Sequence, residues 1–446
     1  MLWRILQLFR HPVPREMALV LAAFLVVGKL KFNSFLPSLA AFGLYTLIPL
    51  QFSLYNIRTM QQHRAQAKLL ASQEPLAKPW AELTAECTPT QERYVVIGGL
   101  GFVGKRIVHA LVLRGERNVL VVDLDSKAMV HMQALYPSVE FKLADVTQFD
   151  DIASTLVGAD CVFAPFAVIR YWESLTKHLN RSWAVNVDGV RNVCEACVLH
   201  KVKRLIVTSS SAVAEPFPSV LSNGLNEDSP KVNQINATSN YCYSKSVGET
   251  IALSYHSPTG LQVSSIRPCT TVFGHGDKLA LSNIERGFYP VMDANNAIDY
   301  VHVDSVVLAH LLCERKLRDD GNLAGGEAFC VNTQAVEDGV FASLVETYFC
   351  TPQRKVKLVV LPGRLIFLLS LGLSLIQYLY PGDVFDLLGK DLGMLTLPTF
   401  LTATKRVLLT SNAKAERVLG YQPHKPIAQA VQQTMQEVAE DRVIMQ

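Results

Sequence analysis

A tyrosine and a lysine lie four residues apart in the segment Tyr241-Cys-Tyr-Ser-Lys245, which opens a predicted helix. Residues at this spacing share one face of a helix, so both side chains can act on the same group. A phenol ordinarily has a pKa of about 10, and a neighbouring ammonium favours its ionised form. Tyr241 can therefore serve as a general acid or base between an alcohol and a ketone.

The position of this pair matters more than its spacing, because chance often places a tyrosine and a lysine four residues apart. The pair follows a predicted strand at residues 203–208, whose carboxyl end continues as Thr208-Ser209-Ser210-Ser211. Ligands of open α/β sheets bind beyond the carboxyl ends of the strands. A serine at this place can therefore hydrogen-bond a substrate oxygen.

A glycine-rich turn separates the apolar run Tyr94 to Ile97 from a segment with apolar residues at helical spacing. Strand, glycine turn and helix in this order can hold a pyrophosphate at the amino end of the helix. Gly98 allows the tight turn, Gly101 lets the backbone approach the phosphates, and Gly104 lets helix and strand pack closely. These residues predict a dinucleotide-binding site.

The acidic residue expected with this turn is Asp123, which ends the next predicted strand about 20 residues further on. A carboxylate there accepts hydrogen bonds from a ribose 2′-hydroxyl and repels a 2′-phosphate. Asp123 is followed by Leu124, and no arginine stands close behind it to neutralise a phosphate. The sequence therefore predicts NAD rather than NADP as the cofactor.

The elements that must position these residues alternate between strand and helix from Glu92 onwards. Such alternation implies right-handed crossovers and a parallel, doubly wound α/β sheet of the Rossmann type. Strands are predicted at residues 93–98, 118–123, 139–143, 159–165, 203–208 and 260–266, and helices at 102–115, 126–136, 149–157, 178–200 and 239–256.

The composition restricts the class of protein. Of the 446 residues, 49% are hydrophobic and 18% are charged, which is apolar for a soluble enzyme and suggests contact with a membrane. The net charge of +3 gives no reason to expect a nucleic acid partner. The nine cysteines are scattered, and Cys194 and Cys197 lie in the middle of a predicted helix. We interpret them as core thiols, and no metal site is predicted.

The amino-terminal region contains two apolar runs. Met17 to Gly28 is short for a membrane span, whereas Phe35 to Tyr55 is long enough but contains Pro37 and Pro49. Two arrangements fit this pattern, a bent hairpin that dips into one leaflet and a single true span. Basic residues on both flanks favour the hairpin, with both ends in the cytosol.

The sequence divides into four predicted parts. Residues 1–60 form a membrane-associated segment, 61–92 a polar linker, 93–270 an NAD-binding Rossmann domain, and 271–446 a smaller, mixed substrate domain with carboxyl-terminal helices. A third apolar stretch, residues 361–380, is predicted to be a helix that lies in the membrane interface or covers the substrate.

Seven motifs occur in an order that resembles the extended short-chain dehydrogenases/reductases: GGLGFVG, VVDLD, NVDGVRNVCEAC, VTSSSAV, YCYSK, IRPCTTVFGHGD and YVHVDSVVLAH. More narrowly, the chain resembles the 3β-hydroxysteroid dehydrogenase/isomerase and sterol-4α-carboxylate 3-dehydrogenase family. The similarity covers about residues 92 to 435 and leaves out the amino-terminal apolar region.

The resemblance implies a role for each cofactor-binding residue. Gly98, Gly101 and Gly104 would hold the pyrophosphate, Asp123 the adenosine ribose and Asp145 the adenine. Asp145 follows the third predicted strand, and its residue type alone would also suit a cap or turn.

The resemblance also implies the catalytic roles. Tyr241 would be the acid/base, and Lys245 would bind the nicotinamide ribose and lower the pKa of the tyrosine. Ser210, three residues before Val213, matches the serine that positions the substrate oxygen, with Ser209 and Ser211 as alternatives. Asn186 matches the asparagine that supports a proton relay.

Two further residues bear on the nicotinamide. Arg267, with Pro268, matches the turn near the nicotinamide. Arg267 could equally form an ion pair, and Asn186 could equally make a hydrogen bond within its helix. Phe166 departs from the family pattern, which usually has a histidine and then small residues after the fourth strand. Phe166 is bulky where the dinucleotide normally passes, so we expect it to restrict the cofactor.

These features predict a membrane-associated, NAD-dependent oxidoreductase that oxidises the 3β-hydroxyl of a steroid or sterol, with decarboxylation if the substrate carries a 4α-carboxylate. Two alternatives share its motifs, a nucleotide-sugar epimerase or dehydratase and a non-catalytic, cofactor-sensing protein. The predicted location is the endoplasmic reticulum membrane, with the catalytic domain facing the cytosol. The predicted partners are the sterol and membrane lipid but no nucleic acid, and a homodimer is left open.

Overall fold

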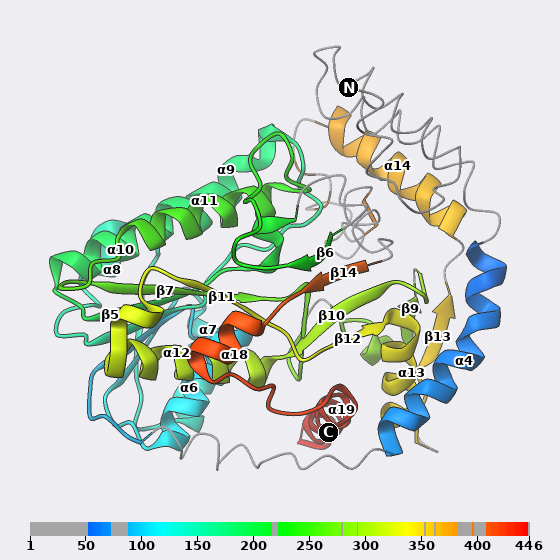
Figure 1. Cartoon of the computed structure of the whole chain (residues 1–446), viewed down its shortest axis with the longest axis horizontal. Helices are drawn as coiled ribbons and strands as arrows, with labels where there is room; N and C mark the ends of the chain where they lie inside the picture. The colour runs from blue at the N-terminus through cyan, green and yellow to red at the C-terminus, as the bar shows by residue number, and fades with distance from the viewer. Residues whose placement is uncertain are drawn as a thin grey trace.

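The computed structural model describes residues 52–72, 88–215, 222–277, 280–291, 293–351, 354–360, 363–380 and 407–444, together with residues 383, 385, 395 and 396 (Figure 1). Residues 1–51 of the predicted membrane-associated segment therefore lie outside the described residues.

The larger sheet of the structure, called the first sheet below, has seven strands. Every neighbouring pair in it is parallel, in the order β11-β7-β5-β4-β1-β2-β3. This is the doubly wound Rossmann arrangement that the sequence predicts. The strands are β1 (Tyr94–Ile97), β2 (Val119–Asp123), β3 (Glu140–Leu143), β4 (Cys161–Ala164), β5 (Arg204–Thr208), β7 (Gln262–Pro268) and β11 (Ala328–Val331).

The central strands are apolar throughout because helices cover both faces of the sheet. Tyr94 and Val96 of β1 point into one core, and Val95 and Ile97 point into the other. On the first face lie α6 (Phe102–Arg114), α7 (Ser126–Leu135), α12 (Val303–Ala324) and α18 (Ala413–Leu419). On the second face lie α8 (Phe149–Ala153), α10 (Val190–Leu199) and α11 (Asn240–Ser254) (Figure 1).

The helix predicted over residues 178–200 is interrupted in the structure. It consists of a 3-10 turn η1 (Thr176–His178), the short helix α9 (Leu179–Trp183), a π-helical turn η2 (Ala184–Gly189) and α10. π-helical turns insert one extra residue into a helix and occur frequently at functional sites. The predicted core position of Cys194 and Cys197 is confirmed, since both are buried in the second core.

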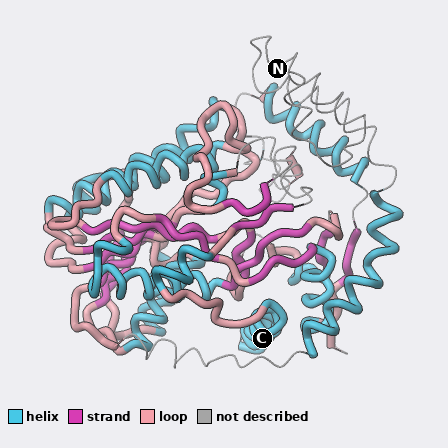
Figure 2. Tube along the Cα trace, in the orientation of Figure 1, coloured by secondary structure: helices cyan, strands magenta, loops and turns pink. Residues whose placement is uncertain are grey.

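A second, five-stranded sheet lies beside the first (Figure 2), in the order β12-β10-β14-β6 with β8 against β10. Its strands are β6 (Ser222–Leu225), β8 (Thr271–Phe273), β10 (Ala297–His302), β12 (Gln334–Glu337) and β14 (Val407–Thr410), and a separate parallel pair joins β9 (Phe288–Val291) to β13 (Lys357–Val360). Shorter 3-10 turns are η3 (Ser211–Ala214) and η4 (Ile284–Arg286).

The two sheets exchange strands across the predicted boundary at residue 270. β11 follows residue 270 in the chain but forms an edge of the first sheet. β6 precedes residue 270 but belongs to the second sheet. The two predicted domains are therefore interleaved in sequence, because strand pairing depends on contacts between residues far apart in the chain.

A third core holds the outer helices against the second sheet. It contains α4 (Phe52–Ser72), α13 (Asp338–Phe349) and α19 (Ile427–Ile444). The rings of Tyr300 and Phe341 stack at its centre, with centroids 4.0 Å apart.

The predicted linker differs from the structure over residues 61–72, which form the second half of α4. Met60 and Ala67 lie on the same face of the helix, and both are buried. Arg64 forms an ion pair with Glu346 of α13 at 2.7 Å. The sparse apolar positions of this polar segment thus form a narrow buried stripe.

The apolar stretch at residues 361–380 forms α14 (Gly363–Leu379). Among the residues that the structure describes, no helix is both long enough and apolar enough to cross a membrane.

Candidate active site

The glycine turn joins β1 to α6 at the carboxyl edge of the first sheet. Gly98 has φ of +82°, a backbone conformation that other residues rarely adopt. A Cβ on Gly104 would lie 2.1 Å from the carbonyl oxygen of Gly98, so only glycine fits there. Gly101 is the N-cap of α6 and carries no side-chain cap. The amino end of α6 can therefore receive an anion, and these residues fit a dinucleotide pyrophosphate.

Asp123 lies next to this turn at the end of β2. Its Oδ2 accepts a hydrogen bond from the amide of Leu100 at 2.9 Å, and its Oδ1 accepts one from the amide of Leu124 at 2.7 Å. A carboxylate has about four acceptor positions, so capacity remains for a ribose hydroxyl.

Asp145 lies at the same edge, two residues beyond β3. Its Oδ1 accepts a hydrogen bond from the amide of Thr147 at 2.8 Å, which shapes the turn after the strand. Leu143 pairs with Asp123 across β2 and β3, so both acidic residues flank one end of the sheet. The structure thus brings Asp145 near the predicted adenine end of the site.

Tyr241 occupies the first turn of α11, where its side chain is buried. The phenol hydrogen-bonds the hydroxyls of Ser210 and Tyr171. The ring of Tyr171 meets the ring of Tyr241 edge-on, with centroids 4.9 Å apart. The predicted pair of Tyr241 and Ser210 is therefore brought together, and Tyr171 joins it from the loop after β4.

Lys245 lies one turn further along α11 and points to the end of β5. Its Nζ donates a hydrogen bond to the carbonyl oxygen of Thr208 at 2.6 Å. Burial lowers the pKa of Lys245 to about 8, against the opposing charge of Glu249.

The electrostatics of Tyr241 differ from the prediction that Lys245 lowers its pKa. Burial raises the pKa of Tyr241 to about 12, and the hydrogen bonds with Ser210 and Tyr171 oppose this rise. Burial prevails because the ammonium of Lys245 is directed at the carbonyl of Thr208 instead of the phenol.

Asn186 lies in the π-helical turn η2 and fastens the loop after β4. Its Oδ1 accepts a hydrogen bond from the amide of Val168 at 2.9 Å, and its Nδ2 donates to the carbonyl of Val168 at 3.0 Å. Nδ2 also lies 3.1 Å from the hydroxyl oxygen of Ser244 on α11. The amide therefore contacts both the loop after β4 and helix α11.

Arg267 on β7 lies in a buried ion pair. Its Nε and Nη2 donate to the two carboxylate oxygens of Glu249 at 2.8 and 2.7 Å. Lys231 approaches the same carboxylate at 2.8 Å. Burial alone would raise the pKa of Glu249, but Arg267 and Lys231 hold it at about 2. The guanidinium thus anchors α11 one turn beyond Lys245.

Phe166 and Ser209 border a small cavity beside Lys245. This cavity has a volume of about 10 Å³, which is near the room that one water needs. A Cβ on Gly98 would lie 2.7 Å from the Cβ of Phe166, so the loop after β4 packs tightly on the glycine turn. Phe166 therefore lies beside both the glycine turn and Lys245.

The hydroxyl of Ser209, one of the two alternatives to Ser210 in the sequence, has different surroundings from that of Ser210. Its Oγ is buried and has no hydrogen-bond partner among the described residues. The hydroxyl of Ser210 instead contacts Tyr241 and accepts a hydrogen bond from the amide of Ala212 at 3.2 Å. Of the two serines, Ser210 is therefore the one that the structure places beside Tyr241.

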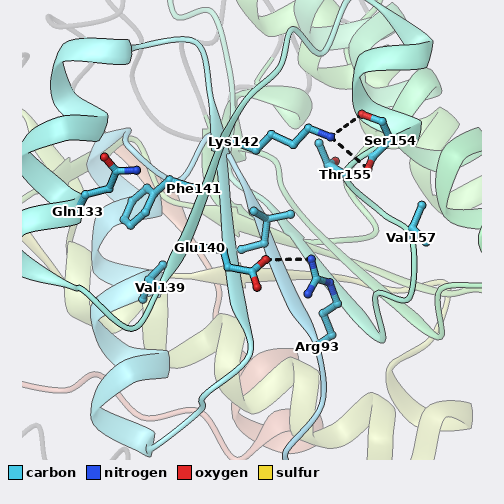
Figure 3. Close-up of a pocket in the computed structure, with 10 residues that line it drawn as sticks. Arg93, Gln133, Val139, Glu140, Phe141, Lys142, Ser154, Thr155 and Val157 are labelled. Carbon is cyan, nitrogen blue, oxygen red and sulfur yellow. Dashed lines mark hydrogen bonds and ion pairs between the residues drawn. The ribbon is translucent and has the colours of Figure 1, made fainter.

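A larger pocket of about 450 Å³ lies at the opposite edge of the sheet, where Glu140 opens β3 and Arg93 precedes β1 (Figure 3). Arg93 bonds Glu140 at 3.2 Å, and Lys142 bonds the hydroxyl of Ser154 at 2.9 Å. None of the predicted site residues lines it.

Known proteins resemble this chain in sequence. A 3beta-hydroxysteroid-dehydrogenase/decarboxylase isoform 1 from Arabidopsis thaliana is 28% identical over 381 residues, which are 79% of this chain and 81% of that protein. A 3-beta-hydroxysteroid dehydrogenase from Mycolicibacterium neoaurum is 27% identical over 348 residues, 74% of this chain and 87% of that protein.

Solved structures resemble the chain in fold. A dTDP-glucose 4,6-dehydratase from Streptomyces venezuelae, solved with NAD, matches with a TM-score of 0.58 and 20% identity, over 79% of this chain and 98% of that one. A UDP-galactose 4-epimerase matches with a TM-score of 0.55 and 19% identity, over 78% and 99%. At this identity the likeness concerns the fold alone.

The sequence model of one protein family matches residues 95–359. This match covers more than half of the chain and includes all of the predicted catalytic residues. This match confirms the resemblance that the ordered motifs predicted. The chain belongs to the 3-beta hydroxysteroid dehydrogenase/isomerase family.

Proposed function

We propose that this protein is an NAD-dependent dehydrogenase that oxidises the 3β-hydroxyl of a steroid or sterol. The observation that carries the proposal is the buried contact of Tyr241 with Ser210, one helical turn from Lys245, at the carboxyl end of the sheet. Membership of the family and the names of the two sequence relatives support the steroid or sterol substrate.

The cofactor would lie along the carboxyl edge of the first sheet. The amino end of α6 would hold the pyrophosphate through Gly98, Gly101 and Gly104, and Asp123 and Asp145 would bind the adenosine. Lys245 and the hydroxyl of Ser209 would face the nicotinamide end, where Arg267 keeps α11 in place. When bound, NAD supplies the acceptor for a hydride.

The residues of this chain would orient the substrate and move one proton. Ser210 and Tyr171 would position the substrate oxygen beside Tyr241, whose phenol oxygen takes the hydroxyl proton during oxidation. In a 4α-carboxysterol, the ketone formed would be a β-keto acid, which can lose carbon dioxide without another catalytic residue. The name of the Arabidopsis relative supports this second step.

An assay of the purified protein tests this function. With a 3β-hydroxysterol as substrate, NADH should form in proportion to the ketone. A nucleotide-sugar epimerase would instead retain its cofactor through turnover and show no net reduction of added NAD. A cofactor-sensing protein would bind NAD and oxidise none of a broad set of alcohols.

The preference for NAD over NADP should depend on Asp123. In Asp123→Ser the repulsion of a 2′-phosphate is lost, so the ratio of the two affinities should fall by about tenfold or more. Calorimetric titration with each dinucleotide measures this ratio. Equal affinities in the wild type would contradict the role of Asp123.

Helix α14 supports the predicted contact with a membrane surface. Among the side chains of α14 that the structure describes, the exposed large ones are hydrophobic and include Leu368, Leu369, Leu375, Ile376 and Leu379. Its inward side is partly polar, since Ser370 and Gln377 are buried. Exposed leucines are unfavourable in water and favourable in lipid, by about 25 cal/mol per Å². Apolar side chains on the exposed side of the helix and polar ones on the buried side favour a position in the membrane interface.

The same helix lies over the loop that reaches the catalytic tyrosine. Leu373 packs with Trp172, and the neighbouring residue Tyr171 contacts Tyr241. Lys177 of this region donates to the carbonyl oxygen of Gln377 at 3.0 Å near the end of α14. A sterol taken from the membrane under α14 would thus arrive beside Tyr241. In this arrangement the catalytic domain would face the cytosol.

Replacing Leu368 and Leu375 by serine should weaken binding to phospholipid vesicles about tenfold or more, because the two side chains no longer enter the lipid. The KM for the sterol should rise more than the KM for NAD. The matched control replaces Leu113 and Leu135, two exposed leucines on α6 and α7, by serine. Equal changes in both variants would show that α14 has no special role.

A further inference from the structure

Thr208, the last residue of β5, has two polar groups that reach opposite faces of the first sheet. Its carbonyl oxygen accepts the hydrogen bond from Nζ of Lys245, on α11. Its side-chain Oγ1 lies 2.7 Å from Nε2 of His310, on α12. Because α11 and α12 cover different faces, Thr208 links the catalytic lysine to a histidine beneath the sheet.

The hydrogen bonds fix the proton of His310. Its Nδ1 lies 2.8 Å from the carbonyl oxygen of Val306, which can only accept, so Nδ1 carries the hydrogen. In the neutral ring, Nε2 is then an acceptor, and the hydroxyl of Thr208 donates to it. Burial lowers the pKa of His310 to about 4, so the ring is neutral in the physiological range.

His310 is held rigidly and cannot reach the reacting atoms itself. Its side chain is fully buried, and its ring packs against Phe163 of β4 with centroids 6.3 Å apart. It closes the motif YVHVDSVVLAH, to which the proposed chemistry assigns no role. Its two ring nitrogens are both used, one on its own helix and one on Thr208.

We propose that His310 is a positioning residue for the catalytic site. By accepting the hydroxyl of Thr208, it fixes the end of β5 and so aims the carbonyl that receives the Lys245 ammonium. The inference rests on the proposed function in one respect, that Lys245 serves the bound cofactor.

The carbonyl of Thr208 and the carboxylate of Glu249 both act on the ammonium of Lys245. Glu249 is the acidic group that acts on the ammonium, from the same helix, and it is itself paired with Arg267 and Lys231. A hydrogen bond to the charged form of an amine raises its pKa, so a misplaced carbonyl should lower the pKa of Lys245.

The test compares Thr208→Val, which removes the hydroxyl and keeps the branched shape, with Thr208→Ser, which keeps the hydroxyl. Competitive labelling of lysines by acetic anhydride, followed by mass spectrometry, reports the pKa of Lys245 without any substrate. Thr208→Val should lower this pKa by about half a unit to one unit and reduce kcat about tenfold. Thr208→Ser should match the wild type.

A second pair of variants tests the histidine directly and serves if Thr208→Val does not fold. His310→Gln retains an acceptor near the place of Nε2 and should keep most of the activity and the pKa of Lys245. His310→Leu should reproduce the effects of Thr208→Val. Folding of each variant is checked by its thermal unfolding midpoint.

The outcomes separate this inference from the proposed function. An unchanged pKa of Lys245 in folded Thr208→Val or His310→Leu would overturn the positioning role. A lowered pKa in a protein whose wild type oxidises no sterol would support the positioning role and overturn the proposed function.

Discussion

Replacing Tyr241 by phenylalanine should lower kcat for a 3β-hydroxysterol by about a thousandfold, with little change in the affinity for NAD. The variant keeps the ring, which packs edge-on against Tyr171, and loses only the phenol oxygen that exchanges the proton. General acid–base catalysis by one side chain contributes about 10² to 10⁴ in rate. Steady-state kinetics and calorimetric titration with NAD measure the two effects.

Two other tyrosines provide controls. Tyr243→Phe changes the same helix, but that ring packs against Trp183 with centroids 5.6 Å apart, so activity should be unchanged. Tyr171→Phe removes one hydrogen bond to the Tyr241 phenol and should lower kcat by about tenfold. Residual activity of Tyr241→Phe above that of Tyr171→Phe would mean that another group moves the proton.

The pH dependence of oxidation follows from the same residue. Burial raises the pKa of Tyr241 to about 12, so the phenol is protonated at neutral pH and is suited to donate a proton. Oxidation needs the phenolate, so its rate should increase as the pH rises through the alkaline range, whereas reduction should not. This trend should be absent from Tyr241→Phe.

Replacing Arg267 by methionine should destabilise the protein by about 3 kcal/mol, because the buried carboxylate of Glu249 loses its two-bond partner and keeps the ion pair with Lys231 and the hydrogen bond from Ser265. Urea unfolding measures the loss. In the double variant Arg267→Met with Glu249→Leu, much of the stability should return, since the buried carboxylate and its guanidinium partner are both gone.

The ion pair also predicts how stability depends on pH. The pKa of Glu249 is held at about 2, below its ordinary value of 4.5. Its contribution is therefore fully present above about 4.5 and is lost as the pH falls towards 2. The double variant should lack this part of the acid sensitivity.

Binding of NAD by Arg267→Met distinguishes the two roles considered for this residue. Where the variant is folded, the affinity should stay near that of the wild type, because the guanidinium is occupied by Glu249. A large loss of NAD affinity with little loss of stability would assign Arg267 to the cofactor.

The first sheet could be predicted almost completely from the sequence. Short runs such as Tyr94 to Ile97 are apolar on both faces and are bounded by glycine or acidic residues, so six of the seven strands lie within about two residues of their predictions. The glycine turn and the Tyr241–Lys245 pair follow from local spacing alone, and the structure places both at the expected edge.

What could not be predicted depends on contacts between distant residues. Neither β6 nor β11 shows in its sequence which sheet it joins. The partner of Arg267 is 18 residues away on another element, and Tyr171 reaches Tyr241 from a loop without a recognisable motif. The π-helical turn at Asn186 also escapes prediction, since the apolar spacing of its helix is almost unchanged.

The most direct measurement follows the hydrogen at C3 of the substrate. A 3β-hydroxysterol that carries deuterium at C3 is incubated with the purified protein and NAD, and the products are analysed by mass spectrometry. We predict one deuterium in the reduced dinucleotide for each 3-ketone formed, and neither product with Tyr241→Phe. Formation of the ketone without deuterium in the dinucleotide, or no ketone from any 3β-hydroxysteroid or sterol, would contradict the proposed dehydrogenase.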